Sequence, residues 1–186
     1  MDLDSQWIIT VIDGKIASAS TNYRQFAAIA DKLAGMSAEK IGEIRCYKTS
    51  FKEIWRLRQE AKWDDFILFG TEFQKKVWKC MFEMGHNGRE KTAKLVSYSD
   101  FAEMCGNKAG VRAAAHAIGL NPIAVVIPCH LVIPKESADW IRDMERGAEV
   151  TLFKGDDLIV PDSLDFGEYA LGKNLKRDLI KMELAY

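Results

Sequence analysis

One cysteine and its neighbours form the densest group of chemically competent residues in the sequence. Cys129 follows Ile127 and Pro128 and precedes His130. The thiolate is the reactive form, and a free cysteine with a pKa of about 8.5 is mostly protonated at neutral pH, so a nearby imidazole has to help ionise it. Adjacent side chains of an extended strand point in opposite directions, so His130 can reach Cys129 only from a turn or through a water molecule. The run predicts a nucleophilic cysteine, with a small buried structural thiol as the alternative.

The remaining cysteines and histidines form no comparable group. Cys46, Cys80 and Cys105 lie far apart and no CxxC pair occurs, so we expect reduced structural thiols rather than a zinc ribbon or a disulfide framework. His86 and His116 lack ligand-like neighbours in the sequence. We therefore expect no metal site and no organic cofactor.

Size and charge limit the class of protein. The 186 residues, 48% hydrophobic and 28% charged, suffice for one core with a small appended lobe. No apolar run reaches the roughly 20 residues of a membrane span, and the start Met1-Asp2-Leu3-Asp4 does not resemble a signal peptide. We expect a soluble, intracellular (cytoplasmic) monomer that does not enter a membrane.

Charge changes sign along the chain although the formal net charge is only -1. Residues 73–130 carry eight basic and four acidic side chains, whereas residues 134–168 carry four basic and ten acidic ones. A basic middle segment is compatible with contacts to phosphates, and an acidic neighbour would weaken them. A solvated surface of mixed sign explains the pattern equally well.

Helices and strands must position Cys129 and its neighbours. The pattern of the first 70 residues predicts a small α/β lobe. Gln6–Ser20 alternates apolar and polar residues around Asp13-Gly14, which predicts a β-hairpin. Apolar spacing predicts a helix from Tyr23 to Leu33, and further elements follow in order: a strand at 41–48, a helix at 51–61 and a strand at 66–69.

Residues 71–186 predict a mainly helical domain that begins after Gly70-Thr71. Two short helices, one beginning near Ser97 and ending at Gly106-Asn107 and one at 109–118, predict a helix-turn-helix. Cys129 then follows a short apolar, strand-like run. The other expected elements are an amphipathic helix from residue 73, the strand at 124–127, a helix at 138–145, a hairpin of 149–153 with 158–160, and a helix at 175–182.

The sequence around Cys129, together with the predicted helix-turn-helix, resembles the O6-alkylguanine-DNA alkyltransferase family. Its motif Ile-Pro-Cys-His-Arg-Val is met by residues 127–132, except that Leu131 stands for the arginine. Its Asn-Pro turn is met by Asn121-Pro122, and without gaps its Ser-Tyr and Arg-Ala pairs are met by Ser97-Tyr98 and Arg112-Ala113. The resemblance covers about residues 73–133 and 169–183.

The resemblance implies a suicidal methylated-DNA–protein-cysteine S-methyltransferase that repairs double-stranded DNA containing O6-alkylguanine. Cys129 would take the alkyl group, His130 would deprotonate it through a water, and Glu183 would orient His130. Asn121 would hold the turn before the site. The DNA contacts implied for the helix-turn-helix come from Ser97, Tyr98, Arg112 and Ala113. Arg112 would fill the gap left by the extruded base, and Tyr98 would help rotate the nucleotide out and donate to the leaving oxygen.

Three departures from the family pattern bear on substrate recognition. Leu131 lacks the charge and the hydrogen-bond donors of the arginine found there in the family. Ala170 stands where many members carry a hydroxyl, and Leu171 replaces a glycine. An acidic insertion at about 134–168 could form a lid, repel DNA or bind another partner. Two other functions stay open: a non-catalytic sensor of alkylated DNA on the same scaffold, and a cysteine hydrolase using Cys129 and His130.

Overall fold

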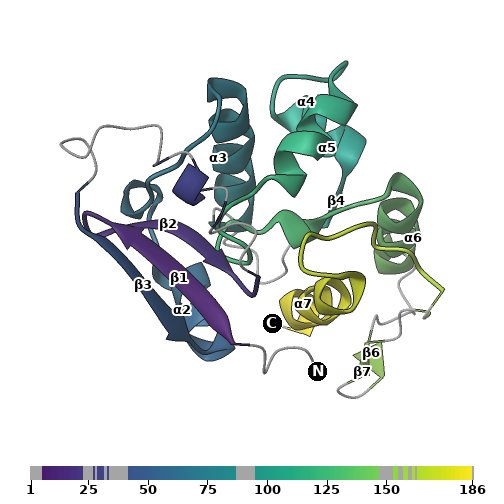
Figure 1. The fold of residues 1–186 in the computed structure, drawn as a ribbon. Helices are drawn as coiled ribbons and strands as arrows, with labels where there is room; N and C mark the ends of the chain where they lie inside the picture. The colour runs from purple at the N-terminus through teal and green to yellow at the C-terminus, as the bar shows by residue number, and fades with distance from the viewer. Residues whose placement is uncertain are drawn as a thin grey trace.

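The N-terminal part is built on a three-stranded antiparallel sheet. The computed structural model describes residues 6–22, 27, 29–31, 33, 42–86, 95–146, 153–154, 157–158, 161 and 163–185. Strands β1 (Trp7–Ile12), β2 (Lys15–Ser20) and β3 (Ile44–Thr49) are ordered β2-β1-β3 (Figure 1). Asp13 and Gly14 both have positive φ, 49° and 77°, as a tight hairpin turn requires. The predicted hairpin and the strand after it are confirmed.

Helix α2 (Phe51–Glu60) packs its inner face on this sheet. Ser50 caps it by accepting a hydrogen bond from the Glu53 amide, and Ile54 and Arg58 are its buried residues. For the helix expected from Tyr23 to Leu33, residues 27, 29–31 and 33 are helical, and the rest lies outside the described residues. A short 3-10 helix, η3 (Trp63–Asp65), follows α2.

The strand expected at 66–69 is wrong. Only Phe66 forms a β-bridge, with Ile16 of β2, and the Ile67 amide donates to the Ile16 carbonyl at 3.0 Å. Residues 67–69 have no regular structure. The segment pairs with β2 at Phe66 only, and the chain then continues toward the next helix. A run of apolar residues is evidence that a segment is buried, but it does not establish that the segment pairs as a strand.

The C-terminal part is mainly helical, as predicted. Its helices are α3 (Glu72–His86), α4 (Tyr98–Met104), α5 (Val111–Gly119), α6 (Lys135–Arg146) and α7 (Lys173–Ala185), with a 3-10 turn η4 (Cys129–Leu131). The short strands β4 (Val96–Ser97) and β5 (Val132–Ile133) pair in parallel, which the sequence did not indicate. Trp78 of α3 is buried and donates to the Ala117 carbonyl of α5 at 2.8 Å, so α3 supports α5 from within.

Helices α4 and α5 form the expected helix-turn-helix. Ser97 caps α4 by accepting from the Asp100 amide at 3.0 Å. Gly106 ends the helix with a φ of 72°, and the Asn107 amide returns to the Ala102 carbonyl at 2.8 Å. A left-handed residue at this place is typical of a helix C-terminus, and it turns the chain directly into α5.

The strand expected at 124–127 is also wrong, because this apolar run is a buried turn. Ala124 bridges to Ile127, and Val125 adopts a φ of 70°, an unusual value for a β-branched residue. Hydrogen bonds from β2 hold the turn: the Ala19 amide donates to the Pro122 carbonyl and the Ala124 amide donates to the Ala19 carbonyl, both at 3.0 Å. The sheet of the first lobe thus fixes the segment that leads to Cys129.

One continuous core joins the two parts of the chain. It includes Trp7, Ile9 and Ile54 from the first part and Val77, Trp78 and Phe101 from the second. The division at residue 70 therefore stays a prediction about sequence organisation. No helix among the described residues has the length and apolar character needed to cross a membrane.

The acidic insertion folds against the helical part. Helix α6 lies beside β4 (Figure 1), and Arg142 of α6 pairs with Asp100 of α4 at 3.2 Å. Ile133, Ala138, Ile141, Phe166 and Ile180 form a second small core between α6 and α7. Strands β6 (Phe153–Lys154) and β7 (Asp157–Leu158) pair around residues 155–156, which agrees with the predicted hairpin in its described part. Most of this hairpin lies outside the described residues.

Candidate active site

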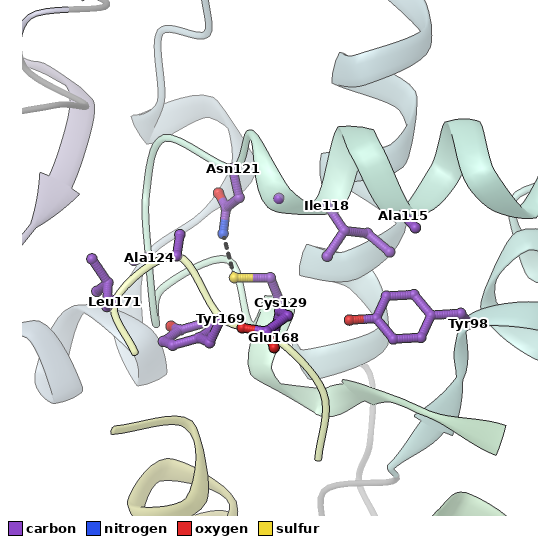
Figure 2. Close-up of a pocket in the computed structure, with 11 residues that line it drawn as sticks. Tyr98, Ala115, Ile118, Asn121, Ala124, Cys129, Glu168, Tyr169 and Leu171 are labelled. Atoms are coloured by element: carbon purple, nitrogen blue, oxygen red, sulfur yellow. Dashed lines mark hydrogen bonds between the residues drawn. The ribbon is translucent and has the colours of Figure 1, made fainter. Parts of the chain in front are cut away.

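Cys129 lies at the first residue of the η4 turn, at the wall of a pocket of about 390 Å³. The pocket is lined by residues of α4, α5, the turn after α5, η4 and the segment before α7: Tyr98, Ala115, Ile118, Gly119, Asn121, Ala124, Cys129, Glu168, Tyr169, Ala170 and Leu171. Cys129 is 7% exposed. Figure 2 shows Asn121 and Tyr98 reaching toward Cys129 from different elements. A small molecule that enters the pocket meets the sulfur.

Asn121 connects the turn to the sulfur through both ends of its amide. Its Nδ2 donates to the Cys129 Sγ at 3.1 Å and to the Ile127 carbonyl at 2.7 Å (Figure 2 marks the bond to sulfur). Its Oδ1 accepts from the Ile123 amide at 3.1 Å. This buried side chain therefore holds the strained turn closed and aims a donor at the thiol, which combines a structural and an electrostatic role.

The thiol is protonated in the resting protein at neutral pH. Burial raises the pKa of Cys129, and the hydrogen bond from Asn121, the charge of Lys176 and the nearby Tyr169 hydroxyl oppose this rise. The Tyr169 hydroxyl is itself buried. The Asn121 hydrogen bond and the Lys176 charge offset part of the cost of a buried thiolate, and a base must still remove the proton.

His130 is turned away from the pocket and into a buried ionic group. Its Nε2 lies 2.9 Å from Oε1 of Glu183 on α7, and its Nδ1 has no hydrogen-bond partner among the described residues. Burial lowers the pKa of His130, although Glu183 opposes this effect. Burial alone would raise the pKa of Glu183, but His130 and Arg58 lower it overall. The pair is a neutral imidazole beside an ionised carboxylate.

The protonation state fixes the tautomer of His130. An ionised carboxylate only accepts hydrogen bonds, so the imidazole carries its hydrogen on Nε2. Its Nδ1 then carries a lone pair that can accept a proton. His130 directly follows Cys129 in the η4 turn. The structure brings together Cys129, His130, Glu183 and Asn121, which are separated by up to 62 positions in the sequence.

Tyr98 stands on the opposite side of the pocket, with its hydroxyl directed toward Cys129 (Figure 2). The Lys176 ammonium lies 5.8 Å from the centre of the Tyr98 ring. Burial raises the pKa of Tyr98, and the charge of Cys129 adds to this effect. Tyr98 is therefore a neutral hydroxyl donor across the pocket from the sulfur.

The other three predicted DNA contacts lie on the helix-turn-helix in different environments. Arg112 and Ala113 are exposed near the start of α5. Ser97 is fully buried, and its hydroxyl caps α4 and bonds to the Ser99 hydroxyl at 2.8 Å. The Ser97 hydroxyl is thus used inside the protein, and a phosphate contact from this residue stays a prediction.

Sequence reasoning missed three residues of the site. Arg58 of α2 contacts Glu183, and Lys176 of α7 donates to the Val132 carbonyl at 2.9 Å, which braces the end of η4 beside buried Leu131. Tyr169 lines the pocket. For Lys176 and Tyr169 the signal available was their place in the closing segment that carries Glu183. For Arg58, 125 positions away from its partner, no local signal existed.

The comparisons with known proteins agree with this geometry. Residues 72–140 match the family model described as the 6-O-methylguanine DNA methyltransferase DNA-binding domain. A probable methylated-DNA–protein-cysteine methyltransferase of Acanthamoeba polyphaga mimivirus is 41% identical over 92 residues, which cover 44% of this chain and 58% of that protein. The inducible methylated-DNA–protein-cysteine methyltransferase of Bacillus subtilis is 42% identical over 69 residues, which cover 37% of this chain and 35% of that protein.

The fold extends beyond the matched segment. A crystal structure of O6-methylguanine-DNA methyltransferase from Pyrococcus kodakaraensis strain KOD1 aligns with a TM-score of 0.53 at 19% identity, covering 96% of this chain and 91% of that chain. At that identity the likeness concerns the fold alone. The sequence matches span less than two thirds of the curated relatives' length. Over residues 72–140, the chain is therefore similar to the DNA-binding domain of the 6-O-methylguanine DNA methyltransferase family.

Proposed function

We propose that this protein repairs alkylated double-stranded DNA by transferring an alkyl group from O6 of guanine to Cys129. The observation that carries the proposal is the grouping of a buried thiol at the pocket wall, an amide donor to its sulfur, and a neutral histidine that follows the thiol and is bonded to an ionised glutamate. The position of the pocket behind an exposed helix-turn-helix supports DNA as the partner. One chain supplies every group named, so we infer that the protein acts as a monomer. Since the proposed substrate is DNA, we infer that it acts inside the cell.

The reaction begins with extrusion of the base. The alkyl carbon on guanine O6 cannot be reached inside a stacked duplex, so the nucleotide must rotate into the pocket at a cost of a few kcal/mol. Arg112 on the exposed side of α5 fills the gap in the duplex. The pocket volume falls within the range of about 300–1,000 Å³ that is usual for small-molecule sites.

The transfer is a displacement at carbon. His130 Nδ1 takes the Cys129 proton through a water molecule, and the sulfur attacks the alkyl carbon. The new S–C bond forms as the C–O6 bond breaks, and the electrons of that bond stay on the guanine oxygen. The Tyr98 hydroxyl donates to this oxygen as its charge grows. The product is a thioether on Cys129, which nothing in the scheme hydrolyses, so each molecule acts once.

Intact-protein mass spectrometry after incubation with duplex DNA containing O6-methylguanine tests the proposal. We expect a mass increase of one CH2 unit that peptide mapping places on Cys129 and that Cys129→Ala abolishes. Tight binding of the modified duplex without any mass change would instead support a non-catalytic sensor. Repeated release of a hydrolysed product from ester or amide substrates would support a cysteine hydrolase.

A second arm separates DNA handling from chemistry. Arg112→Ala should slow transfer from the duplex at least about tenfold, because extrusion carries the unstacking cost, and should leave transfer from a free O6-alkylguanine base unchanged. The matched control is Arg45→Ala, since Arg45 is an exposed arginine of β3, outside the helix-turn-helix. Equal losses with duplex and free base would contradict the role given to Arg112.

A further inference from the structure

A buried arginine of the N-terminal part reaches the ionic group behind the candidate nucleophile. Arg58 of α2 is 6% exposed. Its Nη2 and Nε lie 3.2 and 3.3 Å from Oε1 of Glu183, and its Nη1 donates to the Gly85 carbonyl of α3 at 3.1 Å. The guanidinium is thus held between three helices, α2, α3 and α7.

Arg58 and His130 share one oxygen atom. Oε1 of Glu183 accepts from His130 Nε2 at 2.9 Å and from Arg58, and all three side chains are buried. A buried carboxylate needs a cation to stay ionised, and an arginine is the one side chain that does not release its proton in proteins. With Arg58 as that cation, Glu183 does not need a charged His130.

The other charged and titratable groups around His130 act in the same direction or lie farther along the network. Lys176 of α7 disfavours a positive charge on His130, as Arg58 does, and burial acts most strongly in this sense. His86 of α3 is influenced by the charges of Arg58 and Glu183. Cys129 lies beside His130 in η4. Among the described residues that act on His130, Glu183 alone favours the imidazolium, and Arg58 offsets it.

We propose that Arg58 is a positioning residue for alkyl transfer, which holds Glu183 as an anion so that His130 stays neutral with Nδ1 free to accept the Cys129 proton. This inference rests on the proposed function and deepens it. It assigns the N-terminal part, which lies outside the matched segment of residues 72–140, a direct share in activating the nucleophile.

Replacement of Arg58 by a neutral residue should change the pH dependence of the reaction. In Arg58→Met the carboxylate keeps His130 as its only close cation, so the imidazole stays protonated to higher pH and Nδ1 carries a proton. The acidic limb of the rate profile should move up by at least about one pH unit, which is about tenfold slower transfer at a pH on that limb. Arg58→Lys, which keeps the charge, should restore most of the original profile.

The measurement is single-turnover transfer from a free O6-alkylguanine base between pH 5 and pH 9, read by intact mass in the full chain, for variants that melt cooperatively. Arg56→Met is the matched control, because Arg56 is an exposed residue of the same helix whose ion pairs in the described part of the chain are with half-buried Glu53 and exposed Glu60. Its profile should equal that of the wild type. NMR of the imidazole nitrogens of His130 should show the neutral Nε2–H form in the wild type and the doubly protonated form in Arg58→Met at the same pH.

A double variant keeps the test decisive if Arg58→Met alone does not fold. Arg58→Met with Glu183→Gln removes both buried charges together, which proteins tolerate far better than removal of one partner. Its acidic limb should not move up from that of the wild type, because no carboxylate is left to hold a proton on His130. A wild-type protein that takes no alkyl group defeats the proposed function. A reactive wild type whose profile is unchanged by Arg58→Met, or a double variant whose acidic limb moves up as expected for Arg58→Met, defeats only this inference.

Discussion

At the scale of single residues, the Asn121 amide controls the Cys129 thiol most directly. Asn121→Asp keeps the Oδ1 acceptor for the Ile123 amide but replaces the donor to sulfur with a carboxylate oxygen. A carboxylate beside the sulfur repels a thiolate and raises the pKa of Cys129, and each unit of that rise costs about tenfold in thiolate at neutral pH. We expect at least that loss in the rate of transfer from a free alkylguanine base, measured against pH.

The same substitution has a predictable cost in stability. The Ile127 carbonyl loses its donor from Asn121, which should lower the free energy of unfolding by about 1–3 kcal/mol. Asn107→Asp adds the same charge in the turn between α4 and α5 and serves as the control. If both variants transferred the alkyl group at the wild-type rate, the Asn121 hydrogen bond would have no role in activating the thiol.

Lys176 gives a pH dependence of stability with a definite sign. Burial lowers the pKa of Lys176 to about 8, from an ordinary value of 10.5, although the charge of Cys129 opposes this shift. Between these two values the unfolded chain binds more protons than the folded one, so Lys176 makes the free energy of unfolding rise with pH in this window. Below pH 8 both states hold the proton, and the folded state carries a constant cost.

Lys176→Met should remove that dependence. In urea unfolding at pH 7, 8, 9 and 10, wild-type stability relative to the variant should be flat below pH 8 and rise above it, by up to about 1.4 kcal/mol per pH unit. The raised pKa of Cys129 makes the folded state lose stability as pH rises through it, and the difference between the two proteins removes the part of this trend that they share. Loss of the Lys176 charge raises the pKa of Cys129 further in the variant, which makes the difference rise with pH in the same direction. A difference that falls between pH 8 and 10 would contradict the buried, easily neutralised lysine.

At the scale of elements, the turn of the helix-turn-helix depends on backbone conformation rather than on space. A Cβ on Gly106 would meet only the Lys76 ammonium at 3.6 Å, yet the φ of 72° disfavours any side chain. Gly106→Ala should therefore lower the free energy of unfolding by about 1–2 kcal/mol. Gly119 at the end of α5 is the matched control, because a Cβ there meets nothing within 4 Å and the residue is helical.

We expect Gly119→Ala to stabilise the protein by up to about 1 kcal/mol, through the better helix propensity of alanine. Urea midpoints of the two variants provide the measurement. Equal midpoints would mean that the left-handed conformation at Gly106 is not what ends α4.

Elements marked by local chemistry could be predicted, and those defined by a distant partner could not. The Asp13-Gly14 turn, the Ser97 cap and Gly106 each act within a few residues, so the hairpin and the helix-turn-helix follow from the sequence. The run 124–127 is apolar whether it forms a strand or a buried turn, and its choice depends on β2, about a hundred positions earlier. The two-residue pairing of β4 with β5 is too short to leave a periodic pattern.

At the scale of the whole molecule, the site is assembled by contacts that cross the chain. The motif around Cys129 carried Asn121, His130 and Glu183 into one prediction, because their spacing is a family pattern. Arg58 lay outside that pattern, and its role follows only from the packing of α2 against α7. Sequence reasoning therefore named Asn121 and Glu183, which contact Cys129 and His130, and missed Tyr169, Lys176 and the contact that Arg58 of the first lobe makes with Glu183.

The crossing hydrogen bonds at Ala19 predict how the active-site turn opens. The Ala19 amide donates to Pro122 and the Ala124 amide donates to Ala19, so the turn before Cys129 is bonded to the edge of the sheet. Ala19 and Ala124 are both buried in the continuous core.

Native-state hydrogen exchange should give the amides of Ala19 and Ala124 the same opening free energy as Ile9 inside the β1–β2 ladder, close to the global value. Faster exchange at Ala124 than at Ile9 would mean that the turn opens by itself, and the thiol would then lose its Asn121 donor without unfolding of the sheet. Equal protection would mean that the first lobe and the nucleophile form one cooperative unit, as the shared core requires.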